Sequence, residues 1–402
     1  RQNVRKFLSV FSDKFNNFKQ FFAVKALPNP TILKILYEEG LGFDCSSITE
    51  IEILKRIGVD DSSIIYTGNY NSSTDFSYAL SKNIIINLDD IDGLHNLNKT
   101  QMKLPELISF RLNPFLGKTD SNIISNILAG KSSKFGIDED MIIDAYERAV
   151  RLGFKKFGIH IMTGSCVMDP KYWSILIDTV YRTIAEFHKK LGIRLDFINL
   201  GGGIGIPYEL DQQDIDINQI ALNIRDGIDR NKLLYSLDYE PSIYMENGRY
   251  ITGPFGWLVS RCQSIKRRSN GETFYGLDAC MANLMRPGMY NAYHHICVPR
   301  LQKTLDDNGI MKVETLCSLK KANVVGTLCE NNDWFASDRD LPEKIEKGDL
   351  FMIYDTGAHS HSMGFQYNGK LRCPELLLQL DGTVKLIRQK ETFESLFGNC
   401  MY

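Results

Sequence analysis

The 402-residue sequence has no surplus of positive charge, no long apolar run and no paired cysteine motif. Its formal net charge is -2, which leaves no basic excess to neutralise a phosphate backbone and argues against nucleic acid as a partner. No apolar stretch approaches the roughly 18 residues that cross a bilayer, and the basic amphipathic start lacks a signal-peptide core. These absences favour small-molecule chemistry without a membrane partner.

The nine cysteines are odd in number and include no Cys-x-x-Cys pair, so the sequence predicts neither a disulfide framework nor a zinc site. His294 and His295 are adjacent and would point to opposite faces of an extended segment. His359 and His361 could share a face, but no further ligand accompanies them. We therefore expect that the protein binds no metal. The cysteine usage also predicts a reducing, cytoplasmic setting.

The length exceeds one ordinary hydrophobic core and predicts either a large barrel with an appended domain or two conventional domains. The first residues form a helical pattern of apolar side chains, from Val4 to Phe15, without a cap or a preceding strand. We therefore expect a short additional segment upstream.

Eight short apolar runs alternate with helical stretches over the first 250 residues. The runs are apolar almost throughout, as in parallel strands covered on both faces, and residues 30–40 and 141–154 have helical periodicity. Eight such units are typical of a (β/α)8 TIM barrel, which we predict for residues 1–250. The runs are residues 21–26, 42–47, 63–68, 83–89, 107–113, 156–161, 197–203 and 242–248.

After residue 250 the β-like segments are separated by Gly, Asn and Asp turn signals, which predicts a mainly antiparallel β domain over residues 251–402. Residues 391–398 look like a short terminal helix. The predicted strands of this domain are residues 257–267, 323–329, 349–357, 375–380 and 384–389.

The carboxyl ends of barrel strands are where catalytic groups gather. Lys25 follows the apolar run FFAV, so burial is expected to lower its pKa toward the neutral, nucleophilic form that suits imine chemistry. The alternative is a structural ion pair with a carboxylate such as Asp44. The polar residues at the predicted strand ends are Lys25, Asp44, Arg111, His160, Gly201, Gly202, Gly203 and Glu246.

Two of these strand ends predict a binding site for an anionic, aromatic ligand. The glycines 201–203 would let bare backbone amides approach a phosphate, although such a triplet is also common in plain tight loops. Glu246 could pair with a protonated pyridine nitrogen, while Gly248 and Arg249 face anionic groups. A structural Glu246–Arg249 ion pair is the alternative.

Two segments of the second domain also carry reactive side chains. Cys329 lies beside Glu330 and Asp333 at a strand end, where a thiol can donate a proton, although most single cysteines are inert. Arg286 and Tyr290 could clamp a carboxylate, but an arginine before proline is more commonly a solvent-facing turn residue.

Together these segments resemble the fold type III pyridoxal phosphate (PLP) decarboxylases of the ornithine, diaminopimelate and arginine decarboxylase family, and among them the diaminopimelate decarboxylases. The resemblance covers residues 20–395 and implies a barrel of the alanine-racemase type followed by a β domain. FFAVKALPNP resembles the family's lysine strand, and GFDCSSITEIEIL its second strand and helix. The later motifs occur in the family's order: KFGI, GIHIMTGS, NLGGGIGIPY, ENGR, LDACMANLMRPGMYNAYHHI, LCENND and GAHSHSMGFQYN.

The resemblance implies a role for each matching residue. Lys25 would hold PLP as a Schiff base, Glu246 would hold its pyridine nitrogen, and Cys329 would protonate the product carbon. The remaining implied contacts are Ser165, Gly202 and Gly248 with the phosphate, Asp44, His160, Gly201, Gly203 and His359 with the cofactor more widely, Arg249, Arg286 and Tyr290 with the substrate's distal carboxylate region, and Glu330 with its distal amine.

The implied activity is that of a carboxy-lyase that converts meso-2,6-diaminopimelate to L-lysine and carbon dioxide, the last step of lysine biosynthesis. In this family Cys329 and Glu330 come from the partner subunit, so the resemblance implies a homodimer with shared active sites. Glu330 favours diaminopimelate, because ornithine decarboxylases typically have Asp there.

Three features depart from the family. Met162 replaces a histidine that stacks on the cofactor ring, His359 replaces a tyrosine, and the first strand, normally part of the second domain, is absent. Three other functions stay open. They are a decarboxylase of another diamino acid, such as ornithine or a D-amino acid, a non-catalytic regulatory paralogue, and a phosphate-binding barrel without PLP.

Overall fold

The structure is a computed structural model that describes residues 1–116, 129–130, 133–299, 303–305, 311–313 and 318–401. The chain divides into two compact units, one made of Arg1–Ile206 with Gln213–Ile251 and the other of Pro207–Gln212 with Thr252–Tyr402. Each unit has its own sheet, so the two are described separately.

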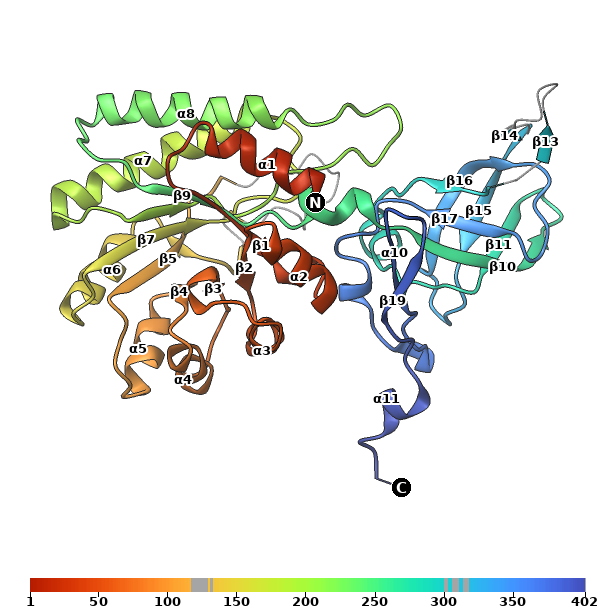
Figure 1. Ribbon diagram of the computed structural model, residues 1–402, viewed down its shortest axis with the longest axis horizontal. Coiled ribbons are helices and arrows are strands. Elements are labelled where there is room, and N and C mark those ends of the chain that lie inside the picture. Colours follow the sequence, from red (N-terminus) through yellow and green to blue (C-terminus); the bar gives the residue numbers. More distant parts are fainter. Residues whose placement is uncertain (117–128, 131–132, 300–302, 306–310, 314–317, 402) are drawn as a thin grey trace. The chain divides into compact units, whose positions relative to one another are not determined.

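The first unit is a parallel barrel, as the sequence predicted. Its strands follow the order β4-β3-β2-β1-β9-β8-β7-β5, and pairing of β4 with β5 closes the ring (Figure 1). Every predicted apolar run overlaps one of these strands, and the short β6 (Ile137–Asp138) pairs in parallel with the end of β5. The barrel strands are β1 (Phe18–Ala23), β2 (Gly42–Cys45), β3 (Ile64–Tyr66), β4 (Ile85–Leu88), β5 (Leu107–Asn113), β7 (Lys156–Ile161), β8 (Phe197–Asn199) and β9 (Ser242–Met245).

Helices cover the outside of the barrel, and α2, α3, α4 and α8 begin at side chains that cap them. The Asn29 side chain accepts a hydrogen bond from the backbone of Thr31, and Pro30 occupies the first turn of α2, which fixes where this helix starts. Ser72 and Asp75 form a capping box on α4. The helices are α1 (Gln2–Ser12), α2 (Pro30–Glu38), α3 (Ile48–Arg56), α4 (Ser73–Ser81), α5 (Asp92–Lys99), α6 (Ile142–Arg151), α7 (Tyr172–Leu191), α8 (Ile217–Leu234) and α9 (Arg249–Thr252).

An apolar layer fills the barrel toward the amino ends of its strands. Phe21, Ile65, Phe197 and Tyr244 form one buried cluster, and the rings of Phe197 and Tyr244 stack with centroids 4.5 Å apart. A Cβ atom at Gly158 would come within 2.1 Å of the Phe197 ring, so this position accepts only glycine. The layer leaves the carboxyl ends of the strands as the place for polar side chains.

The second unit contains a six-stranded sheet in the order β12-β17-β10-β11-β15-β16. Its described pairings are antiparallel except for β11 with β15, in agreement with a mainly antiparallel domain. The sequence patterns predicted segments that overlap β10, β15, β17, β18 and β19, but they missed β11, β12 and β16 of this sheet and the pair of β13 and β14. The remaining elements are β10 (Leu258–Arg267), β11 (Thr273–Leu277), α10 (Arg286–Tyr290), β12 (Ile296–Cys297), β13 (Lys303–Leu305), β14 (Met311–Val313), β15 (Leu319–Val325), β16 (Trp334–Pro342), β17 (Leu350–Ile353), β18 (Glu375–Leu378), β19 (Val384–Arg388) and α11 (Phe393–Phe397).

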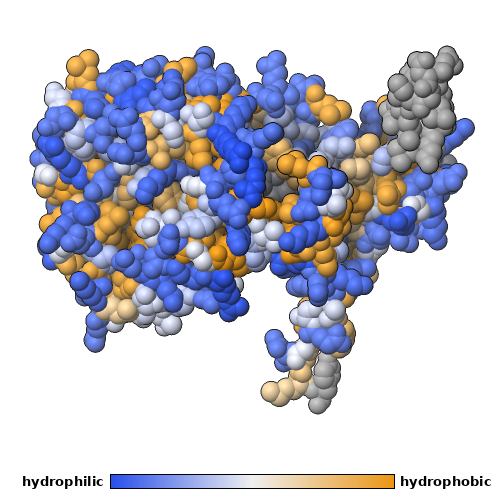
Figure 2. All heavy atoms as spheres, viewed as in Figure 1, coloured by the Kyte–Doolittle hydropathy of each residue, from blue (hydrophilic) through white to orange (hydrophobic). Residues whose placement is uncertain are grey.

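Polar side chains cover most of the face seen in Figure 2, with apolar ones interspersed. Among the described residues no helix combines the length and the apolar character needed to cross a bilayer.

Candidate active site

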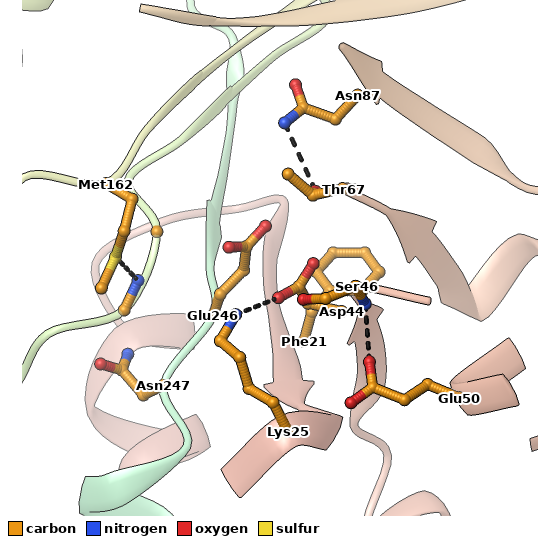
Figure 3. A network of polar contacts seen from close by, with 12 residues as sticks. Phe21, Lys25, Asp44, Ser46, Glu50, Thr67, Asn87, Met162, Glu246 and Asn247 are labelled. Atoms are coloured by element: carbon orange, nitrogen blue, oxygen red, sulfur yellow. Dashed lines mark hydrogen bonds and ion pairs between the residues drawn. The ribbon is translucent and has the colours of Figure 1, made fainter. Parts of the chain in front are cut away.

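Lys25 lies at the carboxyl end of β1, in the single helical turn Val24–Ala26 that follows the strand. Its ammonium Nζ is 3.1 Å from Oδ2 of Asp44, which comes from the neighbouring strand β2. Figure 3 shows both side chains pointing toward Glu246 at the end of β9. About half of the Lys25 side chain is exposed, whereas Asp44 is buried. The lysine therefore presents its amine to an acidic, largely buried group.

The expected lowering of the Lys25 pKa is wrong. Burial does lower this pKa, but the nearby charges of Asp44 and Glu246 outweigh it, so that the pKa of Lys25 is raised above its ordinary value. The sequence could not show this, because the effect depends on how closely acids from two other strands approach. Lys25 therefore rests as an ammonium and must lose a proton before it can attack an aldehyde.

Asp44 is the nearest group that can take this proton. Burial and the charge of Glu246 raise the pKa of Asp44, while Lys25 and His160 pull it back. A carboxyl group with a raised pKa, hydrogen-bonded to the ammonium, is a better proton acceptor than an exposed aspartate. The geometry of Lys25 and Asp44 is that of an ion pair, which was the alternative interpretation from the sequence. The same geometry is also what a lysine activated as a nucleophile requires.

Glu246 is held as a buried anion at the end of β9. Its Oε2 lies 3.1 Å from Nε2 of His160 on β7, and its Oε1 accepts a 2.6 Å hydrogen bond from the amide of Asn199 on β8. Burial alone would raise the pKa of Glu246, but His160, Lys25 and Asn199 lower it below the ordinary value. Asn199 was not singled out from the sequence, although it is the one polar residue in the run FINL.

Several buried polar atoms around this group have no hydrogen-bond partner in the part of the chain that the structure describes. They include Oδ1 of Asp44 and Nδ1 of His160, with Oδ1 of Asn87 and Oγ of Ser109 further along the barrel wall. An unpaired buried polar atom costs roughly 1–3 kcal/mol, so natural proteins rarely keep several together. These atoms fit a polar ligand bound at the carboxyl ends of the strands.

Arg111 on β5 links two of the loops at the carboxyl ends of the barrel strands, one after β4 and one after β7. Its guanidinium lies 3.3 Å from the carboxylate of Asp89 and donates a 3.3 Å hydrogen bond to the carbonyl of Met162. Burial lowers the pKa of Arg111, and Asp89 counteracts this effect. The predicted site residue Arg111 is therefore placed as a support for the loop after β7.

The glycines 201–203 form a tightly packed loop after β8. Gly201 and Gly203 have positive φ angles of 64° and 104°, and a Cβ atom at Gly202 would lie 2.6 Å from the carbonyl oxygen of Glu246. The Gly202 amide donates to Sδ of Met162 at 3.2 Å, and the Glu246 amide donates to the Gly201 carbonyl at 2.7 Å. The loop therefore lies directly against the ends of β7 and β9.

The other predicted phosphate contacts border the same loop. Val167 bridges to Ile204, which brings the segment after β7 beside the glycines. Nη2 of Arg249 lies 3.3 Å from Oγ of Ser165, and a Cβ atom at Gly248 would be 2.6 Å from that of Ala26. Closely packed backbone with a serine and an arginine at its edge is suited to bind a phosphate.

A Gly202→Ala substitution tests this role of the loop. The added methyl group would overlap the carbonyl of Glu246, and such overpacking typically costs about 1–3 kcal/mol. We expect the dissociation constant of the cofactor, measured by equilibrium dialysis, to rise at least about tenfold. Gly130→Ala is the matched control, because no described residue lies within 4 Å of its Cβ position. Equal affinities for both variants would contradict the assignment.

The second unit places its predicted site residues on two segments. Arg286 begins α10 and is buried, contrary to a solvent-facing turn, and Tyr290 ends the same helix. Asp333 is a structural residue, because its carboxylate accepts 2.6 Å hydrogen bonds from the amides of Met281 and Leu328. Asp333 thus connects the segment of Arg286 with the segment that carries Cys329.

Cys329 and Glu330 are both exposed within this unit. The Cys329 amide donates a 2.8 Å hydrogen bond to the side chain of Asn368. His359 is partly buried and has a positive φ angle of 56°, which few non-glycine residues adopt. Its predicted contact with the cofactor stays a prediction. Groups of three or more metal-binding side chains are absent from the described residues.

Comparison with known proteins places these features in context. Residues 1–253 match the family model described as pyridoxal-dependent decarboxylase, pyridoxal binding domain. Protein TabA of Pseudomonas amygdali pv. tabaci is 39% identical over 397 residues, which cover 99% of this chain and 88% of that protein. Diaminopimelate decarboxylase of Methanothermobacter thermautotrophicus is 37% identical over 399 residues, which cover 98% of this chain and 88% of that protein.

Solved structures agree with this likeness over both units. Diaminopimelate decarboxylase of M. jannaschii, in complex with L-lysine, has a TM-score of 0.85 at 29% identity and covers 100% of this chain and 89% of that one. The enzyme of Helicobacter pylori, also complexed with L-lysine, has a TM-score of 0.84 at 27% identity, with 99% and 94% coverage.

Proposed function

We propose that this chain, which belongs to the family of pyridoxal-dependent decarboxylases, removes carbon dioxide from meso-diaminopimelate and releases L-lysine. The observation that carries the proposal is the cluster of Lys25 with the buried side chains of Asp44, His160 and Glu246 inside the region that matches the family's pyridoxal-binding domain. The named diaminopimelate decarboxylases among the relatives, which match nearly the whole chain, support the choice of substrate.

The barrel residues fit pyridoxal phosphate. When bound, this cofactor supplies an electron sink for the bond that is broken. Lys25 would be the amine that attaches to it, and Glu246, kept ionised by His160 and Asn199, would be the anion that holds a protonated ring nitrogen. Ser165 and the glycines 201–203 would hold its phosphate.

Two groups of this chain transfer protons, one at the start of the reaction and one at its end. Asp44, 3.1 Å from the ammonium of Lys25, accepts its proton and so frees the amine. Cys329, whose thiol is exposed in its own unit, donates a proton to the carbon that has lost carbon dioxide. Arg286 with Arg249 and Tyr290 binds the carboxylate that stays on the product, and Glu330 binds the distal amine.

We further propose that the chain forms a homodimer in which Cys329 and Glu330 complete the site of the partner. Their exposure on their own subunit supports this arrangement. The hairpin of β18 and β19 also exposes apolar side chains, including Leu376, Leu378 and Leu386, that association would cover.

The described cysteines are all free thiols, which supports a cytoplasmic location.

A substrate panel tests the proposed reaction. Purified enzyme with pyridoxal phosphate is expected to release L-lysine and carbon dioxide from meso-diaminopimelate. Its kcat/KM should be at least about tenfold above those for L-ornithine, L-lysine and D-amino acids, because these lack the second carboxylate or the matching distal group. Carbon dioxide release and chiral chromatography of the product are the measurements. No turnover of diaminopimelate beside efficient turnover of another amino acid would refute the choice.

A further inference from the structure

His294, which the reaction described so far does not use, lies buried beside Arg286 in the second unit. Nε2 of His294 is 2.6 Å from Nη1 of Arg286. Its other ring nitrogen, Nδ1, is 2.7 Å from the backbone carbonyl oxygen of Tyr354. The imidazole therefore bridges the guanidinium of α10 and the backbone that follows β17.

The chemistry of the two partners determines where the imidazole carries its proton. A guanidinium has donors only, so Nε2 of His294 must accept a hydrogen bond from Arg286. A carbonyl oxygen accepts only, so Nδ1 carries the proton and donates it to Tyr354. Only a neutral imidazole with its proton on Nδ1 satisfies both contacts, because an imidazolium has no acceptor for the arginine.

Other groups of the same unit restrict the two side chains further. The guanidinium of Arg286 lies over the ring of Tyr208, 4.6 Å from its centroid, and the His294 ring meets the same tyrosine edge-on at 5.1 Å. Nη1 of Arg339 donates a 2.8 Å hydrogen bond to the His294 carbonyl. The ring of Tyr208 and the acceptor nitrogen of His294 together fix the plane of the guanidinium.

We propose that His294 is a positioning residue that orients Arg286 toward the carboxylate shared by the substrate and L-lysine. This inference rests on the proposed function, in which Arg286 binds that carboxylate. A guanidinium recognises a carboxylate through two parallel N–H groups in one plane, so the plane decides which ligands can be bound. The contact at Nη1 makes His294 a determinant of specificity for amino acids over simple diamines.

Two amide substitutions separate the two contacts of His294. His294→Asn places an amide nitrogen near the position of Nδ1, which keeps the donor to Tyr354 but removes the acceptor for Arg286. His294→Gln places an amide oxygen near the position of Nε2 and keeps that acceptor. The inhibition constants of L-lysine and of cadaverine, which is lysine without its carboxylate, are then measured on holoenzyme together with KM and kcat for meso-diaminopimelate.

We expect His294→Asn to raise the KM for meso-diaminopimelate and the inhibition constant of L-lysine about tenfold or more, with kcat changed less than about threefold. His294→Gln should restore both constants to within about threefold of wild type, and the cadaverine constant should stay unchanged in both variants. Equal behaviour of the two variants, or a cadaverine constant that rises with that of L-lysine, would overturn the proposal.

The same measurements distinguish this proposal from the proposed function. A wild-type enzyme that does not decarboxylate meso-diaminopimelate refutes the function. A wild-type enzyme that does, with a His294→Asn variant of unchanged lysine inhibition, refutes only the role of His294. Should the variants not fold, histidine-labelled wild-type protein decides by long-range ¹H–¹⁵N NMR at pH 7.5. A proton on Nδ1 alone is expected for His294, and a proton on Nε2 overturns the proposal.

Discussion

A Lys25→Ala variant is expected to lose at least about a thousandfold in kcat for meso-diaminopimelate, because it lacks the amine that is proposed to hold the cofactor covalently. Lys25→Arg is the matched control. It keeps a positive charge beside Asp44, so it preserves the ion pair observed at 3.1 Å but cannot form the covalent bond. We expect Arg and Ala to be equally inactive, as measured by carbon dioxide release. Activity of Lys25→Arg near that of wild type would show that the lysine is only a structural ion-pair partner.

A mixing experiment shows whether the inactive Lys25→Ala subunit is still folded and tests the proposed dimer. Combined with Cys329→Ala, it should recover up to about one quarter of wild-type activity, because half of the dimers are mixed and each mixed dimer has one complete site. Each variant alone should remain inactive. No recovery is expected if Cys329 acts in the site of its own subunit. If both variants are folded dimers and no activity is recovered, shared active sites are contradicted.

Replacing Glu246 with Gln is expected to lower kcat roughly a hundredfold. A glutamine keeps the size of the side chain and can still accept a hydrogen bond from Asn199, but it is neutral. A neutral amide cannot hold the ring nitrogen of the cofactor in its protonated form, so the electron sink is weakened. Glu246→Asp keeps the charge and should fall between Gln and wild type. A Gln variant with unchanged kcat would show that the carboxylate serves only His160.

The barrel could be predicted from the sequence because its strands are short apolar runs at regular spacing, and each predicted run overlaps a strand. In the second unit β16 was missed, since polar residues such as Asp338 and Arg339 interrupt its apolar pattern. Residues 207–212 were assigned to the barrel but belong to the second compact unit. The compact unit to which such a segment belongs depends on contacts between residues far apart in the sequence. The local hydrophobic periodicity carries no information on these contacts.

Within the site, the sequence indicated which residues matter but not how they act on one another. The positions of Lys25, Asp44, His160 and Glu246 at strand ends were predictable, because parallel strands bring their carboxyl ends to one face. The raised pKa of Lys25 was not, since it depends on the approach of Asp44 and Glu246 from other strands.

Two departures from the family pattern also depend on the local geometry. The sequence identified Met162 only as the residue that replaces a histidine of the family pattern. In the structure its sulfur accepts a hydrogen bond from the Gly202 amide. A thioether can thus support the glycine loop directly. His294, set aside as a metal ligand because its neighbour is His295, lies instead against Arg286.

The proposed role of Lys25 is tested most directly by finding the residue that carries the cofactor. Holoenzyme is reduced with sodium borohydride, which makes the attachment permanent, then digested and mapped by mass spectrometry. We expect a phosphopyridoxyl group on the peptide that contains Lys25, and no label on this peptide in the Lys25→Arg variant. Stable label on a different lysine, or a wild-type protein that binds the cofactor without any lysine being labelled, would contradict this role.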